Sequence, residues 1–160
     1  QGNVNLALLE ALKADEFFSK PFPKTTGPEL FSIDYVRKAQ TQSQTENITI
    51  EDLLATLTRF SAETIADAIH SAINNTTFSP ETFTIYMSGG GAHNPLLVSW
   101  LKELLPCTFS NTDTLGISGD AKEAILFAIL ANETVSGGTS DFGTRKGIPS
   151  VSMGKISFPN

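Results

Sequence analysis

The residues best suited to chemistry are three consecutive glycines, Gly89–Gly91, between an apolar strand and the start of a helix. The strand is indicated by residues 82–87 (TFTIYM), and the helix by Asn94 and Pro95 ahead of an apolar segment. Glycine inside a strand or helix costs about 0.5–1 kcal/mol relative to alanine, so this run indicates a sharp turn or a close approach of a ligand. Asparagine is a good N-cap and proline suits the first helical position. The free N–H groups of such a helix start attract phosphate or another anion.

The loop by itself leaves two interpretations open, a nucleotide or phosphate site and a tightly packed structural turn. Its glycine spacing is not that of the dinucleotide-binding fingerprint. No Gly-Lys-Ser/Thr follows, so it is not a P-loop. No Gly-x-Ser-x-Gly elbow surrounds Ser88, which argues against a hydrolase nucleophile.

Composition narrows the function classes. With 160 residues, 40% of them hydrophobic, the chain suits one domain or one lobe of a larger enzyme. The net charge of −6 and the absence of a basic stripe argue against a nucleic-acid partner. No apolar run approaches the roughly 20 residues of a membrane span.

A single cysteine, Cys107, fits a reducing compartment, and we expect it to be buried and inert. Two histidines, His70 and His93, without further ligands do not predict a metal site.

Hydrophobic spacing predicts the elements that must position the glycine loop. We expect helices over residues 4–12, 32–36, 49–73, 95–105 and 121–133, strands over 82–87 and 107–110, a solvated loop over 40–46, and a final strand or tail over 151–158. The order strand, glycine loop, helix, strand, helix favours an α/β fold with a parallel strand pair. Two or three strands are few for a complete sheet, which again suggests one lobe of a larger molecule.

Two motifs together resemble the C-terminal part of the anhydro-N-acetylmuramic acid kinase family. They are residues 87–97 (MSGGGAHNPLL) and residues 112–124 (TDTLGISGDAKEA). Residues 21–31 (PFPKTTGPELF) resemble the family's proline-rich Lys-Ser/Thr-Thr-Gly segment, and residues 55–69 resemble its Ala-Thr-Leu-Thr helix. Residues 154–156 resemble its closing segment, so that the likeness spans essentially the whole chain in order.

The resemblance implies an activity and a fold. The family consists of sugar kinases with an actin-like, ribonuclease H-like ATPase fold. The resemblance implies that residues 1–160 form a single helix-rich C-terminal lobe with a short, mostly parallel sheet flanked by helices. The family uses ATP, Mg²⁺ and water to open 1,6-anhydro-N-acetylmuramic acid and phosphorylate O6, giving N-acetylmuramic acid 6-phosphate in cytoplasmic cell-wall recycling. The family's first phosphate loop and catalytic aspartate belong to an N-terminal lobe, and neither pattern occurs here, so we expect no catalytic residue in this chain.

The resemblance also implies roles for particular residues. Gly89, Gly90, Gly91 and Asn94 match the family's adenosine motif and are expected to bind the nucleotide, which is compatible with the cap role of Asn94. Glu123 matches a glutamate that faces the sugar cleft. It would equally complete a capping box with Asp120, and both interpretations stay open.

Residues 24–27 also leave two interpretations open. Lys24, Thr25 and Gly27 could reach phosphate or adenine, or could belong to a solvated loop.

Two functions remain in competition. One is the nucleotide-binding lobe of an anhydro-sugar kinase, which needs its N-terminal lobe for activity. The alternative is a non-catalytic stand-alone binding or assembly module derived from the same fold. Such a module could be a homodimer, because loss of the partner lobe would expose apolar surface. The chain lacks the motifs of an independent hydrolase or dehydrogenase.

Overall fold

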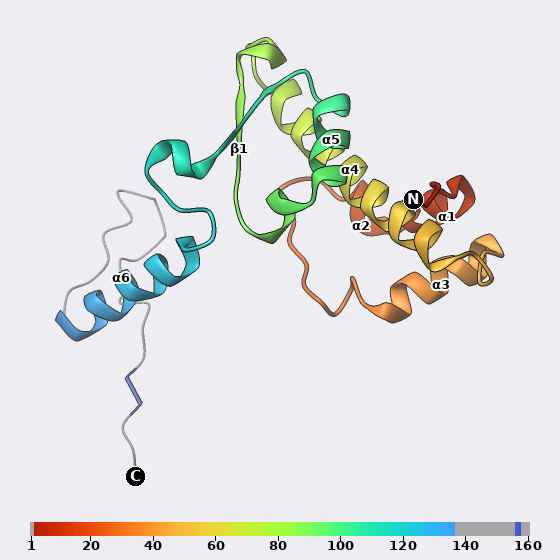
Figure 1. The fold of residues 1–160 in the computed structure, drawn as a ribbon, viewed down its shortest axis with the longest axis horizontal. Coiled ribbons are helices and arrows are strands. Elements are labelled where there is room, and N and C mark those ends of the chain that lie inside the picture. The colour runs from red at the N-terminus through yellow and green to blue at the C-terminus, as the bar shows by residue number, and fades with distance from the viewer. Residues whose placement is uncertain (1, 137–155, 158–160) are drawn as a thin grey trace. The chain divides into compact units, whose positions relative to one another are not determined.

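The computed structural model describes residues 2–136 and 156–157 (Figure 1). Its contacts divide the chain into two compact units. The first unit holds residues 1–86 and 90–110, and the second holds residues 87–89 and 111–160. Most of the expected final strand over 151–158 lies outside the described residues.

The first unit is built around one long helix, α4 (Ile50–Asn74). Thr49 caps it, because its side chain accepts a hydrogen bond from the backbone N–H of Asp52. This confirms the helix expected over 49–73. Helix α1 (Leu6–Lys13) packs against α4 and against α3 (Ile33–Ser43), and Figure 1 shows α5 (Pro95–Leu104) alongside α4. A short helix, α2 (Glu16–Ser19), lies in the aromatic segment that joins α1 to α3.

Two hydrophobic clusters hold these helices together. In the first, Ala62 and Ala66 of α4 are buried with Leu101 and Leu105 at the end of α5. The second buries Leu8 and Leu12 of α1 against Ala39 of α3, with partly buried residues of α4 around them. The small side chains of α4 allow close approach of α5, and the leucines of α1 fill the space toward α3.

The loop expected over residues 40–46 is wrong in its first part, because α3 continues to Ser43. Burial of Ala39 against α1 favours helix in this segment, although its glutamines and threonines suggest a solvated loop. The helix ends at Gln44, whose φ of 56° is left-handed and closes the last turn.

The sheet is short. Strands β1 (Thr84–Met87) and β2 (Thr108–Asn111) form a two-stranded parallel sheet, with α5 in the connection between them. A 3₁₀ turn (Pro80–Thr82) precedes β1. The expected helix-rich α/β organisation with a parallel pair is thereby confirmed. The actin-like assignment stays a prediction.

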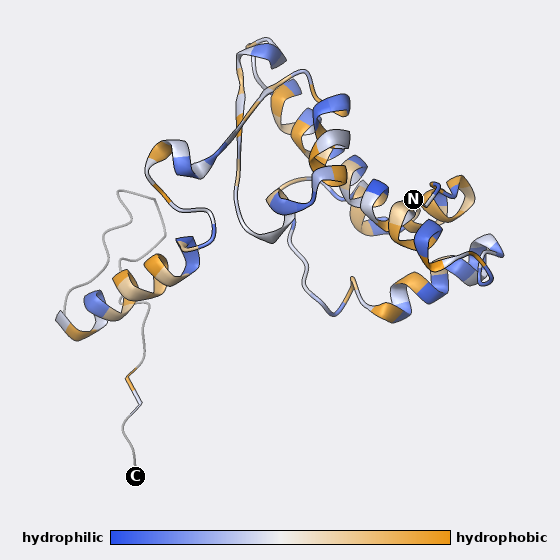
Figure 2. Cartoon of the chain, viewed as in Figure 1, coloured by the Kyte–Doolittle hydropathy of each residue, from blue (hydrophilic) through white to orange (hydrophobic). Residues whose placement is uncertain are grey.

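The second unit contains a 3₁₀ turn (Thr112–Leu115) and helix α6 (Lys122–Ser136). Figure 2 shows extensive apolar colouring on α6. Four of its large apolar side chains, Ile125, Leu126, Phe127 and Ile129, are between 44% and 67% exposed. In the part of the chain that the structure describes, α6 is therefore an apolar helix without a matching apolar cover.

Candidate functional site

The glycine loop has the local structure that its sequence predicts. Strand β1 leads to Ser88 and Gly89, a 3₁₀ turn follows over Gly90–His93, and α5 then begins at Pro95. Gly89 has a φ of +78°, a left-handed conformation in which a side chain is strained. Within residues 2–136 and 156–157, a Cβ atom on Gly90 would meet no atom within 4 Å, so these residues leave the backbone of Gly90 open to an approaching ligand.

Asn94 is the N-cap of α5, as expected. Its Oδ1 accepts hydrogen bonds from the backbone N–H groups of Leu96 and Leu97, both at 3.1 Å. The Oδ1 atom is therefore used by the helix, and the Nδ2 group is the part of the side chain that could reach a ligand. Nucleotide binding by Gly89, Gly90, Gly91 and Asn94 stays a prediction.

The second predicted segment enters α6. Gly116 ends the 3₁₀ turn with a φ of +78°, and Ser118 Oγ accepts a hydrogen bond from the backbone N–H of Ala121 at 3.3 Å. Helix α6 begins at Lys122, which places the exposed Glu123 in its first turn. A carboxylate there is favoured by the helix dipole, whatever else it contacts. Both the sugar-facing and the capping interpretations of Glu123 stay predictions.

One hydrogen bond joins the two predicted segments inside the second unit. Lys122 Nζ donates to Ser88 Oγ at 2.7 Å. The structure therefore brings the residue before Gly89 and the residue before Glu123 together. Sequence reasoning did not single out Lys122, and no pattern around it would have identified it.

The expected structural roles of the other candidate residues are partly met. His70 Nε2 lies 3.2 Å from the carbonyl oxygen of Leu104, which ties α4 to the end of α5. Cys107 is half-buried rather than buried, and its Sγ donates to the carbonyl oxygen of Pro80 at 3.4 Å. Among residues 2–136 and 156–157, no three His, Cys, Asp or Glu side chains gather closely enough to hold a metal ion.

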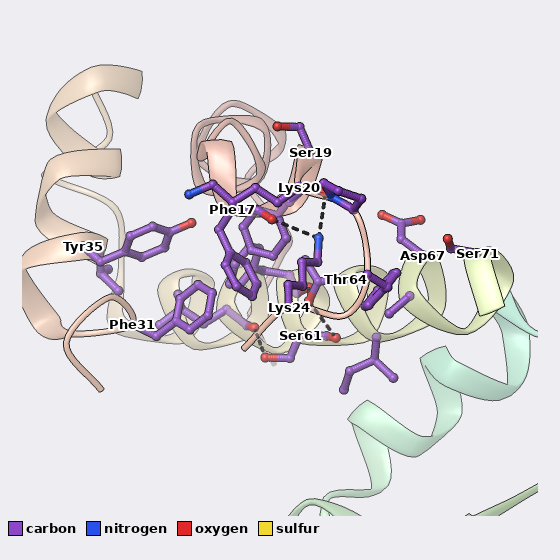
Figure 3. Close-up of a pocket in the computed structure, with 18 of the residues that line it drawn as sticks. Phe17, Ser19, Lys20, Lys24, Phe31, Tyr35, Ser61, Thr64, Asp67 and Ser71 are labelled. Atoms are coloured by element: carbon purple, nitrogen blue, oxygen red, sulfur yellow. Dashed lines mark hydrogen bonds between the residues drawn. The ribbon is translucent and has the colours of Figure 1, made fainter. Parts of the chain in front are cut away.

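The first unit contains a pocket that sequence reasoning missed. It has a volume of about 930 Å³ and lies between residues 17–24, the start of α3 and one face of α4 (Figure 3). Aromatic rings make much of its wall: Phe17, Phe18, Phe22, Phe31, Tyr35 and Phe60. Several of these rings meet edge to face, with centroids 5.3–5.7 Å apart, in a mutually supporting cluster.

Lys24 holds the aromatic wall of the pocket in place. Its ammonium donates to the carbonyl oxygens of Phe17 and Phe18, both at 2.9 Å, and lies 4.9 Å and 5.0 Å from the ring centroids of Phe17 and Phe22 (Figure 3). The backbone N–H of Gly27 is likewise used, by Glu29 Oε1 at 2.9 Å. These contacts favour a structural role for Lys24 and Gly27 over the ligand contacts that their sequence allowed.

The floor of the pocket is a face of α4 with small and hydroxyl side chains. The hydroxyls of Ser61 and Thr64 donate back to the carbonyl oxygens of Leu57 and Phe60, at 3.0 Å and 2.9 Å. Their donors are therefore used within the helix, and the pocket presents a mainly apolar surface. In the sequence, the small side chains Ser61, Thr64, Ala68 and Ser71 recur at helical spacing. This spacing alone predicts a helix face with small side chains and does not indicate a pocket.

Burial at the edge of this pocket changes one ionisation. Partial burial, with a smaller contribution from the negative charge of Asp15, raises the pKa of the Tyr35 phenol to about 12. The phenol donates to the carbonyl oxygen of Leu12 and so links α3 to α1. Tyr35 is a structural hydrogen-bond donor at neutral pH rather than an acid–base group.

A strand, a glycine loop and a capped helix follow one another in this chain. This arrangement is typical of α/β proteins that bind a phosphate-containing ligand at the start of the helix. Comparison with known proteins makes this specific. The family profile for anhydro-N-acetylmuramic acid kinase matches residues 1–156. The chain therefore belongs to the anhydro-N-acetylmuramic acid kinase family.

Individual relatives agree with the family assignment. A protein named anhydro-N-acetylmuramic acid kinase from Pseudoalteromonas atlantica is 52% identical over 163 residues, which cover 100% of this chain and 40% of that protein. Its namesake from Streptomyces avermitilis is 40% identical, covering 98% of this chain and 39% of that protein. The Vibrio cholerae namesake is 36% identical, covering 100% and 42%. The chain thus spans about two fifths of the length of these relatives.

Proposed function

We propose that this chain is the C-terminal, nucleotide-binding lobe of an ATP-dependent sugar kinase. The enzyme would open the 1,6-anhydro bond of anhydro-N-acetylmuramic acid with water and transfer the γ-phosphoryl group of ATP to O6. The products would be N-acetylmuramic acid 6-phosphate and ADP. Family membership over nearly the whole chain is the observation that carries this proposal.

The glycine loop is the part of this chain that would take the nucleotide. Gly90 offers open backbone, Gly89 supplies the left-handed turn, and Asn94 starts a helix whose free N–H groups favour an anion. Mg²⁺ would arrive with the ATP phosphates, because Mg²⁺ is commonly held by substrate phosphates and one or two carboxylates. Glu123 is proposed to face the sugar.

The location and partners follow from the same proposal. None of the described helices is long and apolar enough to cross a membrane. We place the enzyme in the cytoplasm, where ATP is available, with an N-terminal lobe supplying the catalytic aspartate. The absence of nucleic-acid partners belongs to the same proposal, and a homodimer belongs to the alternative of a stand-alone module.

The test is calorimetric titration with Mg·ATP of the protein expressed from its complete reading frame, compared with the Gly90→Val variant. Because a Cβ on Gly90 meets no described residue within 4 Å, this variant should fold and yet obstruct the loop. Binding by the wild type that Gly90→Val loses supports the proposal. Unchanged binding would place the nucleotide elsewhere. Absence of binding at millimolar Mg·ATP would favour the non-catalytic module.

A further inference from the structure

Lys122 carries an anchored positive charge beside Ser88 and Gly89, within the second unit. Its Nζ donates to Ser88 Oγ at 2.7 Å, across 34 positions of sequence. An ammonium group has three donors, so this bond leaves capacity for a ligand. Within the described residues, no carboxylate forms an ion pair with Lys122, whereas Lys13, Lys20, Arg37 and Arg59 each have at least one.

The ammonium lies beside the first glycine of the loop. Of the atoms that the structure describes beyond its two chain neighbours, a Cβ atom on Gly89 would meet one within 4 Å, the Nζ of Lys122 at 3.8 Å. No other described residue closes the backbone of Gly89 on that side. A group that approaches Gly89 there would meet the Lys122 charge at once.

The surrounding residues indicate which kind of group this would be. The position of a Cβ on Gly119 is 3.6 Å from the Cα of Ser88, 3.5 Å from Thr112 Oγ1 and 3.6 Å from Asp113 Oδ2. Thr112 Oγ1 is buried and has no hydrogen-bond partner among the described residues. Ser88 therefore has the Lys122 ammonium at its hydroxyl, and the turn at Gly119, with Thr112 and the Asp113 carboxylate, beside its Cα. A free anion would be repelled by Asp113, whereas a phosphate carrying a divalent cation would meet complementary charge at both groups.

We infer that Lys122 is a phosphate-binding residue beside Ser88 and Gly89, and that its ligand is a nucleotide polyphosphate complexed with a divalent cation. This inference rests on the proposed function and adds to it a residue outside the family's glycine motif. Lysine suits this role because its ammonium is a compact charge that binds phosphate without fixed geometry. The bond to Ser88 holds the ammonium beside Gly89 before the ligand arrives.

The experiment compares Lys122→Met with the wild type, in the protein expressed from its complete reading frame, by titration with adenosine, Mg·ADP and Mg·ATP. Lys122→Met should weaken Mg·ADP and Mg·ATP at least about tenfold, the scale of a hydrogen bond to a charged group. Adenosine should bind both proteins equally. Ser88→Ala removes the anchor and keeps the charge, so it should weaken the two phosphates less than Lys122→Met does.

Lys102→Met is the matched control, because Lys102 is exposed on α5 in the first unit. It should leave all three affinities unchanged, and thermal melting checks that each variant is folded. Equal phosphate binding by Lys122→Met and the wild type would overturn the inference and leave the proposed function standing. Equal loss of adenosine and of Mg·ATP would show a purely structural role and would also overturn it. A wild type that binds no nucleotide would overturn both.

Discussion

Replacing Glu63 by glutamine should remove the strongest charged link between α1 and α4. Glu63 Oε2 lies 2.8 Å from Lys13 Nζ, and Glu63 Oε1 lies 2.8 Å from Arg59 Nε. The side chains of Lys13, Glu63 and Arg59 are only 28%, 19% and 20% exposed. Solvent therefore screens these pairs less than it screens ordinary surface ion pairs.

The magnitude follows from what glutamine can keep. A hydrogen bond to a charged group contributes about 1.5–3 kcal/mol to stability. Glutamine keeps one acceptor oxygen but loses the negative charge and the second acceptor. It leaves Lys13 and Arg59 facing a neutral amide, with the more exposed carboxylates of Asp67 at 3.5 Å and Glu103 at 3.9 Å as their remaining charged partners. We expect the free energy of unfolding to fall by about 1.5–3 kcal/mol at pH 7, the equivalent of one such bond.

The same link predicts a pH dependence with a definite sign. Burial alone would raise the pKa of Glu63, but hydrogen bonds from Lys13 and Arg59 and their charges outweigh it and hold the pKa below 4.5. A depressed carboxyl pKa gives stability that is fully present above the unfolded value and lost as the pH falls through the folded value. The deficit of Glu63→Gln should therefore be full at pH 7 and shrink below about pH 4.5.

Urea unfolding from pH 7 to pH 3 measures this, with the fluorescence of the single tryptophan, Trp100, as the probe. Its ring lies 5.5 Å from the Arg59 guanidinium carbon, so it reports on the same region. Glu10→Gln, an exposed site on α1, is the control and should change stability by less than about 0.5 kcal/mol. A Glu63→Gln deficit that is absent at pH 7, or constant down to pH 3, would refute the reasoning.

Three further perturbations have definite expected outcomes. Gly2→Ala would place a Cβ 1.9 Å from the carbonyl oxygen of Glu51, so urea unfolding should show a loss of about 1–3 kcal/mol; stability equal to that of the wild type would contradict this packing. Asn94→Ala should lose about 1 kcal/mol in the same assay through loss of its cap, and Asn94→Ser should restore most of it; an Asn94→Ser variant as weak as Asn94→Ala would argue against the cap. In an alkaline absorbance titration, Tyr35→Phe should remove a transition near pH 12, and the native state should lose stability as the pH rises from about 10 toward that value; a transition that persists in the variant would show that it belongs to another group.

The glycine loop illustrates what local sequence predicts well. The turn at Gly89 and the start of α5 at Asn94 and Pro95 depend on the intrinsic preferences of those residue types. These preferences act over a few residues and need no knowledge of the rest of the fold. The same holds for the cap of α4 at Thr49.

Features that depend on tertiary contacts could not be predicted from these local preferences. The extension of α3 past Val36 depends on burial of Ala39 against Leu8 and Leu12, residues distant in sequence. The aromatic pocket requires α2, α3 and α4 to meet, and Lys24 folds back onto carbonyl oxygens rather than facing solvent or a ligand. The pairing of Lys122 with Ser88 likewise joins segments that sequence periodicity treats separately.

Helix α4 contributes residues to both hydrophobic clusters of the first unit. Its Ala62 and Ala66 belong to the cluster with α5, and its Leu57 and Phe60 pack against the cluster of α1 and α3. A helix propagates order along its length because each hydrogen bond depends on its neighbours. Neither cluster can open while the shared helix stays intact and fully packed. The first unit should therefore exchange its central α4 amide hydrogens only through one concerted opening, and behave as a single cooperative folding unit.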